Sequence, residues 1–145
     1  MRVLVCGGRS FDNYEAVEKY LDMLNSLHRF TLLIHGGAQG ADTCAARWAR
    51  SRHIDVRPYP AMWGAHGRAA GHIRNGQMLR EGQPDMVVAF PGGRGTRNML
   101  KQSSWVPNLK IVNLSLAATR AEVEEQWRIL DRSRRSPTTE ACPLR

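Results

Sequence analysis

The sequence is poor in residues that form disulfides or bind metals. Its 145 residues include three cysteines and five histidines. The cysteines (Cys6, Cys44 and Cys142) form no Cys-x-x-Cys pair, and no two histidines have the short spacing of a zinc site. We therefore expect neither a metal nor a cofactor. We also expect free thiols in a reducing cytoplasm, with Cys6 and Cys44 as small core residues.

Long apolar runs and several catalytic motifs are also missing. No stretch approaches the roughly 20 apolar residues of a membrane helix, and residues 1–6 lack the layout of a signal peptide. We expect a cytoplasmic protein that does not enter membranes. Neither a Gly-x-Ser-x-Gly elbow nor a Walker loop occurs, so a serine hydrolase or P-loop ATPase has no support. Aromatic residues make up 7% of the chain and are scattered, with no visible stacking platform for nucleic acid.

Acidic residues are fewer than basic ones. The chain has 21 lysines and arginines against 13 aspartates and glutamates, a formal net charge of +8. Arginine predominates over lysine, and arginine suits phosphate recognition, so the excess indicates phosphate-ester or polyanion partners. Residues 132–145 contain four arginines and one glutamate. We expect this segment to be a basic, disordered tail after a single domain of residues 1–131.

The most informative stretch lies at residues 85–96. Residues 85–90 form a short apolar run behind an aspartate, typical of a buried strand. Pro91-Gly-Gly-Arg-Gly-Thr96 follows and leads straight into a helical pattern. Glycines let the backbone approach a ligand, and the first N–H groups of a helix attract anions. The pattern favours an anion-binding turn over an ordinary tight turn.

Similar units alternate along the chain. We expect the strands and helices at the following residues: strands at 2–6, 30–34, 54–57, 85–90 and 109–113, helices at about 13–24, 41–52, 68–81, 96–104 and 119–130, and a loop at 61–67. This alternation predicts an α/β protein, a Rossmann-like three-layer αβα sandwich with a parallel sheet of about five strands. Glycine turns follow three strands, at Gly7, Gly36 and Gly92. They would line one crevice if those strands are neighbours.

Five motifs in order resemble one family. Pro91-Gly-Gly-Arg-Gly-Thr96 resembles the P-G-G-x-G-T motif of the LOG nucleotide phosphoribohydrolases, and residues 36–42 resemble the glycine-rich loop of the DNA-processing protein DprA. With Gly7-Gly-Arg9, Tyr59-Pro-Ala-Met-Trp63 and Gly71-His-Ile-Arg-Asn75, they are similar to the YspA-like, cpYpsA-related branch of the SLOG superfamily. The resemblance covers about residues 1–115. It implies a Rossmann-like fold and a site for a nucleotide derivative, such as a nucleoside monophosphate, ADP-ribose or an NAD-type molecule.

The resemblance also bears on catalysis. In the LOG enzymes an arginine upstream of the glycine turn and a glutamate three residues past its threonine carry the chemistry. Arg74 stands where that arginine would be, whereas Met99 occupies the glutamate position. A thioether can neither take a proton nor stabilise an oxocarbenium ion, so the departure argues against LOG-type N-glycoside cleavage.

The candidate site residues come from these motifs. Arg74 and Asp42 are the catalytic candidates, although Asp42 fits a purely structural role in the first turn of its helix better. Arg9 either binds a phosphate through two N–H groups of its guanidinium or is an ordinary surface arginine. Trp63 and His66 either cover a base or pack at an edge or oligomer contact. The predicted ligand-binding set is Gly7, Gly8, Arg9, Gly36, Gly37, Gly40, Asp42, Arg74, Asn75, Pro91, Gly92, Gly93, Gly95 and Thr96.

Three functions remain open from the sequence. The preferred one is the binding of a nucleotide-derived small molecule, as a sensor, carrier or sequestering protein. The second is an enzyme that hydrolyses such a ligand at its N-glycosidic or phosphoester bond, with Asp42 in place of the missing glutamate. The third is DprA-like binding of single-stranded nucleic acid, which a basic chain would do weakly and with a steep salt dependence. The resemblance also implies a homo-oligomer.

Overall fold

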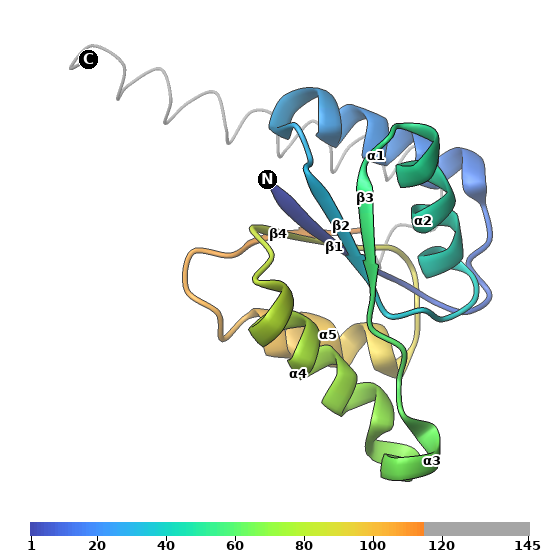
Figure 1. Ribbon diagram of the computed structural model, residues 1–145, viewed down its shortest axis with the longest axis vertical. Helices are drawn as coiled ribbons and strands as arrows, with labels where there is room; N and C mark the ends of the chain where they lie inside the picture. Colours follow the sequence, from blue (N-terminus) through green and yellow to red (C-terminus); the bar gives the residue numbers. More distant parts are fainter. Residues whose placement is uncertain (115–145) are drawn as a thin grey trace. The chain divides into compact units, whose positions relative to one another are not determined.

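A computed structural model describes residues 1–114 of the protein (Figure 1). The elements follow in the order β1 (Arg2–Cys6), α1 (Tyr14–His28), β2 (Leu32–His35), α2 (Ala41–Ser51), β3 (Asp55–Pro58), α3 (Trp63–His66), a 3₁₀ turn (Gly67–Ala69), α4 (Ala70–Gly82), β4 (Met86–Ala89), α5 (Arg94–Ser103) and β5 (Lys110–Asn113). The predicted helix at 119–130 and the predicted tail at 132–145 lie outside the described residues.

The five strands form one parallel sheet in the order β3-β2-β1-β4-β5. In the register of the central strands, Leu4 lies between Ile34 of β2 and Val87 of β4. The chain builds outward from β1 to β3, then returns to the other side of β1 for β4. The strand order therefore reverses beside β1, and ligands of open α/β sheets bind at such a switch point. The predicted parallel sheet is confirmed, and the three strands with glycine turns are neighbours.

Helices cover both faces of the sheet, as Figure 1 shows, with α1 and α2 on one face and α4 and α5 on the other. Because side chains alternate along a strand, each strand contributes to both layers. Toward α4 and α5, the shared core consists of Leu4, Cys6, Leu32, Ile34, Met78, Val87, Ala89 and Met99. The architecture is the predicted Rossmann-like three-layer αβα sandwich.

A side-chain cap determines where α1 begins, and one carboxylate joins α1 to α2. Asn13 caps α1, where its side chain accepts a 3.2 Å hydrogen bond from the Ala16 N–H. Asp22 of α1 accepts hydrogen bonds from the indole Nε1 of Trp48, at 2.9 Å, and from the guanidinium of Arg52. Trp48 is fully buried, so this pairing satisfies a polar atom that the core would otherwise leave without a partner.

The structure differs from the sequence prediction between β3 and β4. The segment predicted as a loop contains the short helix α3, and α4 begins at Ala70 rather than near Arg68. Ile73, an apolar residue of α4, is 42% exposed, whereas the polar Asn75 is 3% exposed. The buried face of α4 therefore includes a polar residue, because Asn75 hydrogen bonds with α5.

Smaller differences concern the ends of elements. β2 begins at Leu32 rather than residue 30, and α5 begins at Arg94, two residues before the predicted start. The earlier start of α5 places Gly95 and Thr96 inside its first turn. Within residues 1–114, no helix has the length and apolarity needed to cross a bilayer.

Candidate functional site

The three glycine turns meet at the carboxyl ends of β1, β2 and β4, and Gly8 joins them. Its N–H donates a 2.8 Å hydrogen bond to the Pro91 carbonyl in the turn after β4. Its own carbonyl accepts a 3.2 Å hydrogen bond from the N–H of Ala41, the first residue of α2. The turn after β1 therefore connects the start of α2 to the turn before α5.

Two glycines make this junction compact. Gly40 has a φ of +77°, and a Cβ there would clash with the Gly8 and Arg9 carbonyls. A Cβ on Gly92 would meet the Gly8 backbone nitrogen at 2.6 Å and would also clash with the Thr96 hydroxyl. Both positions need glycine because neighbouring turns pack directly against them.

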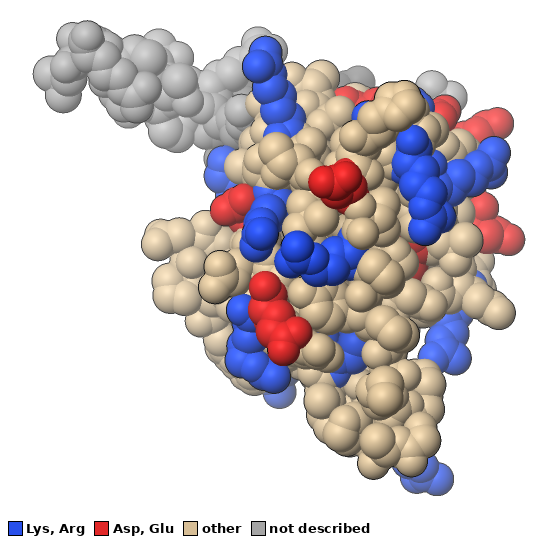
Figure 2. Space-filling view, in the orientation of Figure 1, with Lys and Arg blue, Asp and Glu red and all other residues tan. Residues whose placement is uncertain are grey.

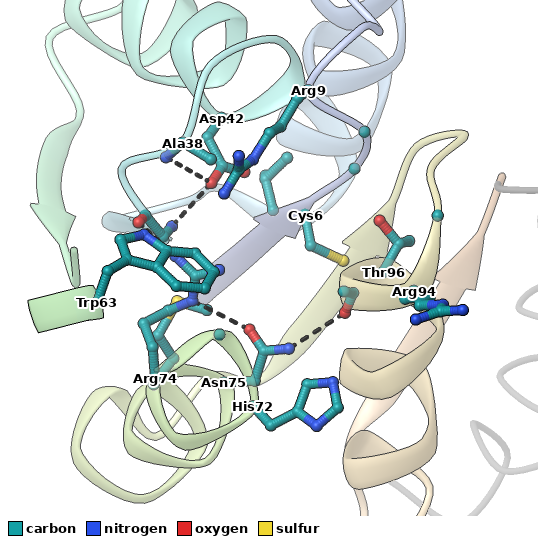
Figure 3. A pocket seen from close by; sticks show the side chains of 18 of the residues that line it. Cys6, Arg9, Ala38, Asp42, Trp63, His72, Arg74, Asn75, Arg94 and Thr96 are labelled. Carbon is teal, nitrogen blue, oxygen red and sulfur yellow. Dashed lines mark hydrogen bonds between the residues drawn. The ribbon is translucent and has the colours of Figure 1, made fainter. Parts of the chain in front are cut away.

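A cavity of about 600 Å³ opens beside this junction (Figure 3). Ten of the predicted site residues line it: Gly7, Gly8, Arg9, Gly36, Asp42, Arg74, Asn75, Gly93, Gly95 and Thr96. The other four predicted residues, Gly37, Gly40, Pro91 and Gly92, do not line it. Gly37 has a φ of +73° and lies beside Pro60, so its glycine serves the path of the loop.

Arg74 reaches from α4 to the turn after β2. Its guanidinium donates to the Gly36 carbonyl through one NH group and to the Asn75 Oδ1 through Nε, the latter at 3.2 Å. The guanidinium also covers Gly36 so closely that a Cβ there would overlap it. Burial lowers the pKa of Arg74, and the Asp42 carboxylate opposes that effect. Arg74 is thus held in place before any ligand arrives.

Asn75 links α4 to the first turn of α5. Its Nδ2 donates to the Gly95 carbonyl and to the Asn98 Oδ1, both at 3.1 Å. Gln102 donates a further 2.7 Å hydrogen bond to the same Asn98 oxygen. This network fixes the cavity-facing end of α5 relative to Arg74.

Asp42 has the structural role that its position favoured, and it also lines the cavity. Its Oδ2 accepts hydrogen bonds from the N–H groups of Gly36, at 3.1 Å, and Ala38, at 3.2 Å, and so shapes the turn after β2. The side chain is 5% exposed. Burial raises the pKa of Asp42 to about 6, although both N–H groups and the Arg74 guanidinium favour its charged form.

The amino end of α5 is open toward the cavity. Gly93 is its N-cap and provides no side chain to occupy the first N–H groups. Gly95 has no positive φ, and a Cβ there would meet nothing within 4 Å. Backbone conformation therefore does not require glycine at 95, and no described residue fills the space beside it.

The sequence analysis missed several residues of the cavity wall. Arg68, His72 and Arg94 line the cavity together with the predicted residues. Arg94 stands between the glycines of the predicted phosphate turn, a position that could have identified it. His72 stands within the family motif Gly71-His-Ile-Arg-Asn75, which could have identified it, whereas Arg68 lies in the 3₁₀ turn, outside the five motifs. Met99, at the position of the LOG glutamate, is fully buried in the core and does not line the cavity.

The cavity is strongly basic. Its lining includes the arginines Arg9, Arg68, Arg74 and Arg94, against a single carboxylate, that of Asp42. On the face that Figure 2 shows, basic and acidic side chains are interspersed and form no continuous basic stripe. The four arginines line a hollow whose volume suits a small molecule.

Aromatic and apolar groups complete the wall. Trp63 of α3 lines the cavity, whereas His66 of the same helix does not. Cys6 and Met78, both buried, contribute apolar surface, and burial raises the pKa of the Cys6 thiol well above its usual range. Among residues 1–114, no cluster of side chains is suited to bind a metal ion.

The fold and the cavity at its switch point define a Rossmann-like α/β protein with a basic cavity. The model of the YspA, cpYpsA-related SLOG family matches residues 1–66. The Gene 61 protein of Mycobacterium phage D29 is 39% identical over 112 residues, which cover 70% of this chain and 87% of the phage protein. The chain belongs to the YspA, cpYpsA-related SLOG family.

Two solved structures are similar to this chain. The glycinamide ribonucleotide transformylase 1 of Symbiobacterium toebii is 20% identical, with a TM-score of 0.48 over 78% of this chain. The phosphoribosylglycinamide formyltransferase of Bacillus halodurans is 22% identical, with a TM-score of 0.44 over 89% of this chain. The chain spans 50% of the first protein and 66% of the second.

Proposed function

We propose that the protein binds a nucleotide or nucleotide derivative in the cavity at the carboxyl ends of β1, β2 and β4. The observation that carries this proposal is the charge of the cavity, which four arginines and one carboxylate line. Side chains of this kind repel one another unless an anion neutralises them. A phosphate ester fits both the charge and the volume of about 600 Å³, because ligand cavities of about 300–1,000 Å³ hold molecules of that size.

The phosphate would bind at the amino end of α5. The first N–H groups of the helix carry the positive end of its dipole, and Gly95 leaves room for an oxygen to reach them. Arg94 lies in the same turn and supplies a charged donor. Arg74 is held by Gly36 and Asn75, so its ordering costs little when the ligand binds.

A hydrolytic activity on the same ligand is the second candidate, and Asp42 is the observation that favours it. Its carboxyl group lines the cavity and has a pKa of about 6, close to the pH at which a general base operates best. Such a carboxylate could take a proton from the water that attacks an N-glycosidic or phosphoester bond. Met99 contributes nothing to this chemistry, since it lies in the core.

The test is a calorimetric and thermal-shift panel on the full chain. The panel contains AMP, ADP, ADP-ribose, NAD and a short single-stranded DNA, and each well is assayed for released base and phosphate. A ligand at 100 times its Kd stabilises a protein by about 2.7 kcal/mol, a shift of several degrees at this size. A shift without release supports the binding function, and release that Asp42→Asn abolishes supports the hydrolase. Native mass spectrometry of the same sample reports whether the protein forms the expected homo-oligomer.

A matched pair of variants ties any signal to the cavity. Arg94→Gln removes a cavity arginine, whereas Arg97→Gln removes an exposed arginine of the same helix that does not line the cavity. Both reduce the net charge equally. We expect Arg94→Gln to weaken nucleotide binding about tenfold or more, because hydrogen bonds to charged groups are worth about 1.5–3 kcal/mol. Equal losses in both variants, or a salt-resistant shift with DNA alone, would contradict the proposed site.

A further inference from the structure

Trp63 differs from the other large apolar residues among residues 1–114 because it both lines the cavity and is exposed to solvent. Its indole lines the cavity and yet is 49% exposed. α3, which carries it, buries none of its four residues. The side chain therefore contributes little to the core and remains accessible from the cavity, and ligand cavities are commonly lined by aromatic side chains.

The indole lies across the cavity from the proposed phosphate site. Figure 3 shows Trp63 on one side, with Arg94 and Thr96 on the opposite side. Among the described lining residues, Trp63 provides the only indole or phenyl ring. A ligand with a phosphate at the amino end of α5 would therefore extend its other end toward this ring.

The guanidinium of Arg9 lies over the indole of Trp63. The carbon atom of its guanidinium lies 5.5 Å from the centre of the Trp63 ring, within the range of a cation–π contact. Arg9 is exposed and also lines a second hollow of about 460 Å³ beside the glycine junction. No hydrogen bond to a carboxylate holds this guanidinium among the described residues, so an anion in the cavity can attract it.

We propose that Trp63 is the surface on which the nucleobase of the ligand stacks, and that Arg9 moves from the indole to the phosphate when the ligand binds. This inference rests on the proposed nucleotide-binding function and names the part of the ligand that α3 recognises. Stacking on an indole accepts any base, because every base has a π-face.

The test compares ligands with and without a base. AMP, GMP, CMP and UMP are titrated by calorimetry against ribose 5-phosphate, which keeps the phosphate and sugar alone. Trp63→Ala should weaken binding of the nucleotides about tenfold and leave ribose 5-phosphate within about twofold, because stacking is worth about 1–3 kcal/mol per base. Trp63→Phe should keep most of the affinity. Trp105→Ala is the matched control, since Trp105 is 68% exposed and does not line the cavity.

Each outcome separates the two proposals. Nucleotides that bind Trp63→Ala as tightly as the parent protein overturn the stacking role and leave the proposed function intact. A parent that binds neither nucleotides nor ribose 5-phosphate overturns both. If Trp63→Ala fails to fold, Trp63→Leu replaces it, because leucine keeps the apolar area without a flat ring. Its affinities for the nucleotides and for ribose 5-phosphate are then interpreted in the same way.

The role of Arg9 has its own readout. Arg9→Gln should weaken ribose 5-phosphate and the nucleotides by the same factor, because the lost contact is to the phosphate. Unchanged ribose 5-phosphate binding in this variant would show that Arg9 stays on the indole and would overturn that half of the proposal.

Discussion

The N–H of Gly8 donates a 2.8 Å hydrogen bond to the carbonyl of Pro91, which joins turns that are 83 residues apart in the sequence. Gly8 has no room for a side chain, because a Cβ there would lie 3.0 Å from both the Pro91 carbonyl oxygen and the Gly92 Cα. Gly8 therefore allows two turns to pack and also lines the cavity, whereas Gly40 and Gly92 serve the packing and do not line the cavity.

The first prediction concerns a packing glycine. Gly40→Ala should destabilise the fold by about 2 kcal/mol or more, because it forces a side chain into a positive-φ conformation against two carbonyls. Urea denaturation measures the loss. Gly64→Ala, in α3, is the control and should be neutral or slightly stabilising, since its Cβ meets nothing. Equal stability of the two variants would contradict the structure of the junction.

The second prediction concerns a cavity glycine. Gly95→Ala should stabilise the protein by about 0.5–1 kcal/mol, because Gly95 lies in α5 with ordinary backbone angles and alanine favours helix. The same methyl group occupies the space that we assign to a phosphate, so nucleotide affinity should fall about tenfold if one charged hydrogen bond is lost. Thermal melting and calorimetry on the same sample separate the two effects. Higher stability with unchanged affinity would place the ligand elsewhere.

The third prediction concerns the network at Asn75. Asn75→Ala should cost about 1–3 kcal/mol of unfolding free energy, because it removes the hydrogen bonds of a buried amide to the Gly95 carbonyl and the Asn98 side chain and releases Arg74. Gln77→Ala on the same helix is the control, since Gln77 makes one exposed contact to Glu81 and should change stability by less than about 0.5 kcal/mol. Chemical denaturation of both variants provides the comparison. A neutral Asn75→Ala would show that water replaces the network.

The fourth prediction concerns pH. The pKa of Asp42 is raised to about 6 by burial, so its contribution to stability falls as pH rises from about 4 to 6. His35 is 6% exposed, and burial, with Arg50 and Arg74 nearby, lowers its pKa to about 4. Its contribution therefore rises with pH between about 4 and 6.5, and the two opposing effects should leave the parent protein nearly insensitive to pH in this window.

Single variants should reveal separately the pH dependence that each of the two residues causes. In Asp42→Asn only His35 remains, so stability should increase by on the order of 2 kcal/mol from pH 4.5 to 6.5. In His35→Gln only Asp42 remains, and stability should decrease over the same range. Melting temperatures of both variants, measured at half-unit pH steps, test the two expected trends. Parallel curves for the two variants would contradict the assigned pKa shifts.

The sequence predicted the fold well because its strands are short apolar runs and its helices have regular spacing. Val17, Leu21 and Leu24 indicated the buried face of α1 directly, and all three are buried. Ile73 was misleading, since the buried face of α4 is set partly by the amide of Asn75 rather than by apolar residues. Patterns of hydrophobicity do not report a polar network between two helices.

The candidate site was harder to predict at the level of single residues. Glycine motifs located the crevice, but the sequence does not distinguish Gly40, which needs a positive φ, from Gly95, which does not. Backbone strain therefore requires glycine at position 40 and not at position 95. Arg68, in the 3₁₀ turn, and His72, in α4, line the cavity because of how these two segments pack in the tertiary structure.

The junction at Gly8 also determines when the cavity can exist. It brings together residues 8, 41 and 91, so the cavity needs β1, β2 and β4 already paired, with long loops closed between them. Long-range parallel pairing is slow to form in folding. A nascent or partly unfolded chain therefore lacks the cavity. The amount of bound nucleotide would measure only the fraction of molecules in which β1, β2 and β4 are paired.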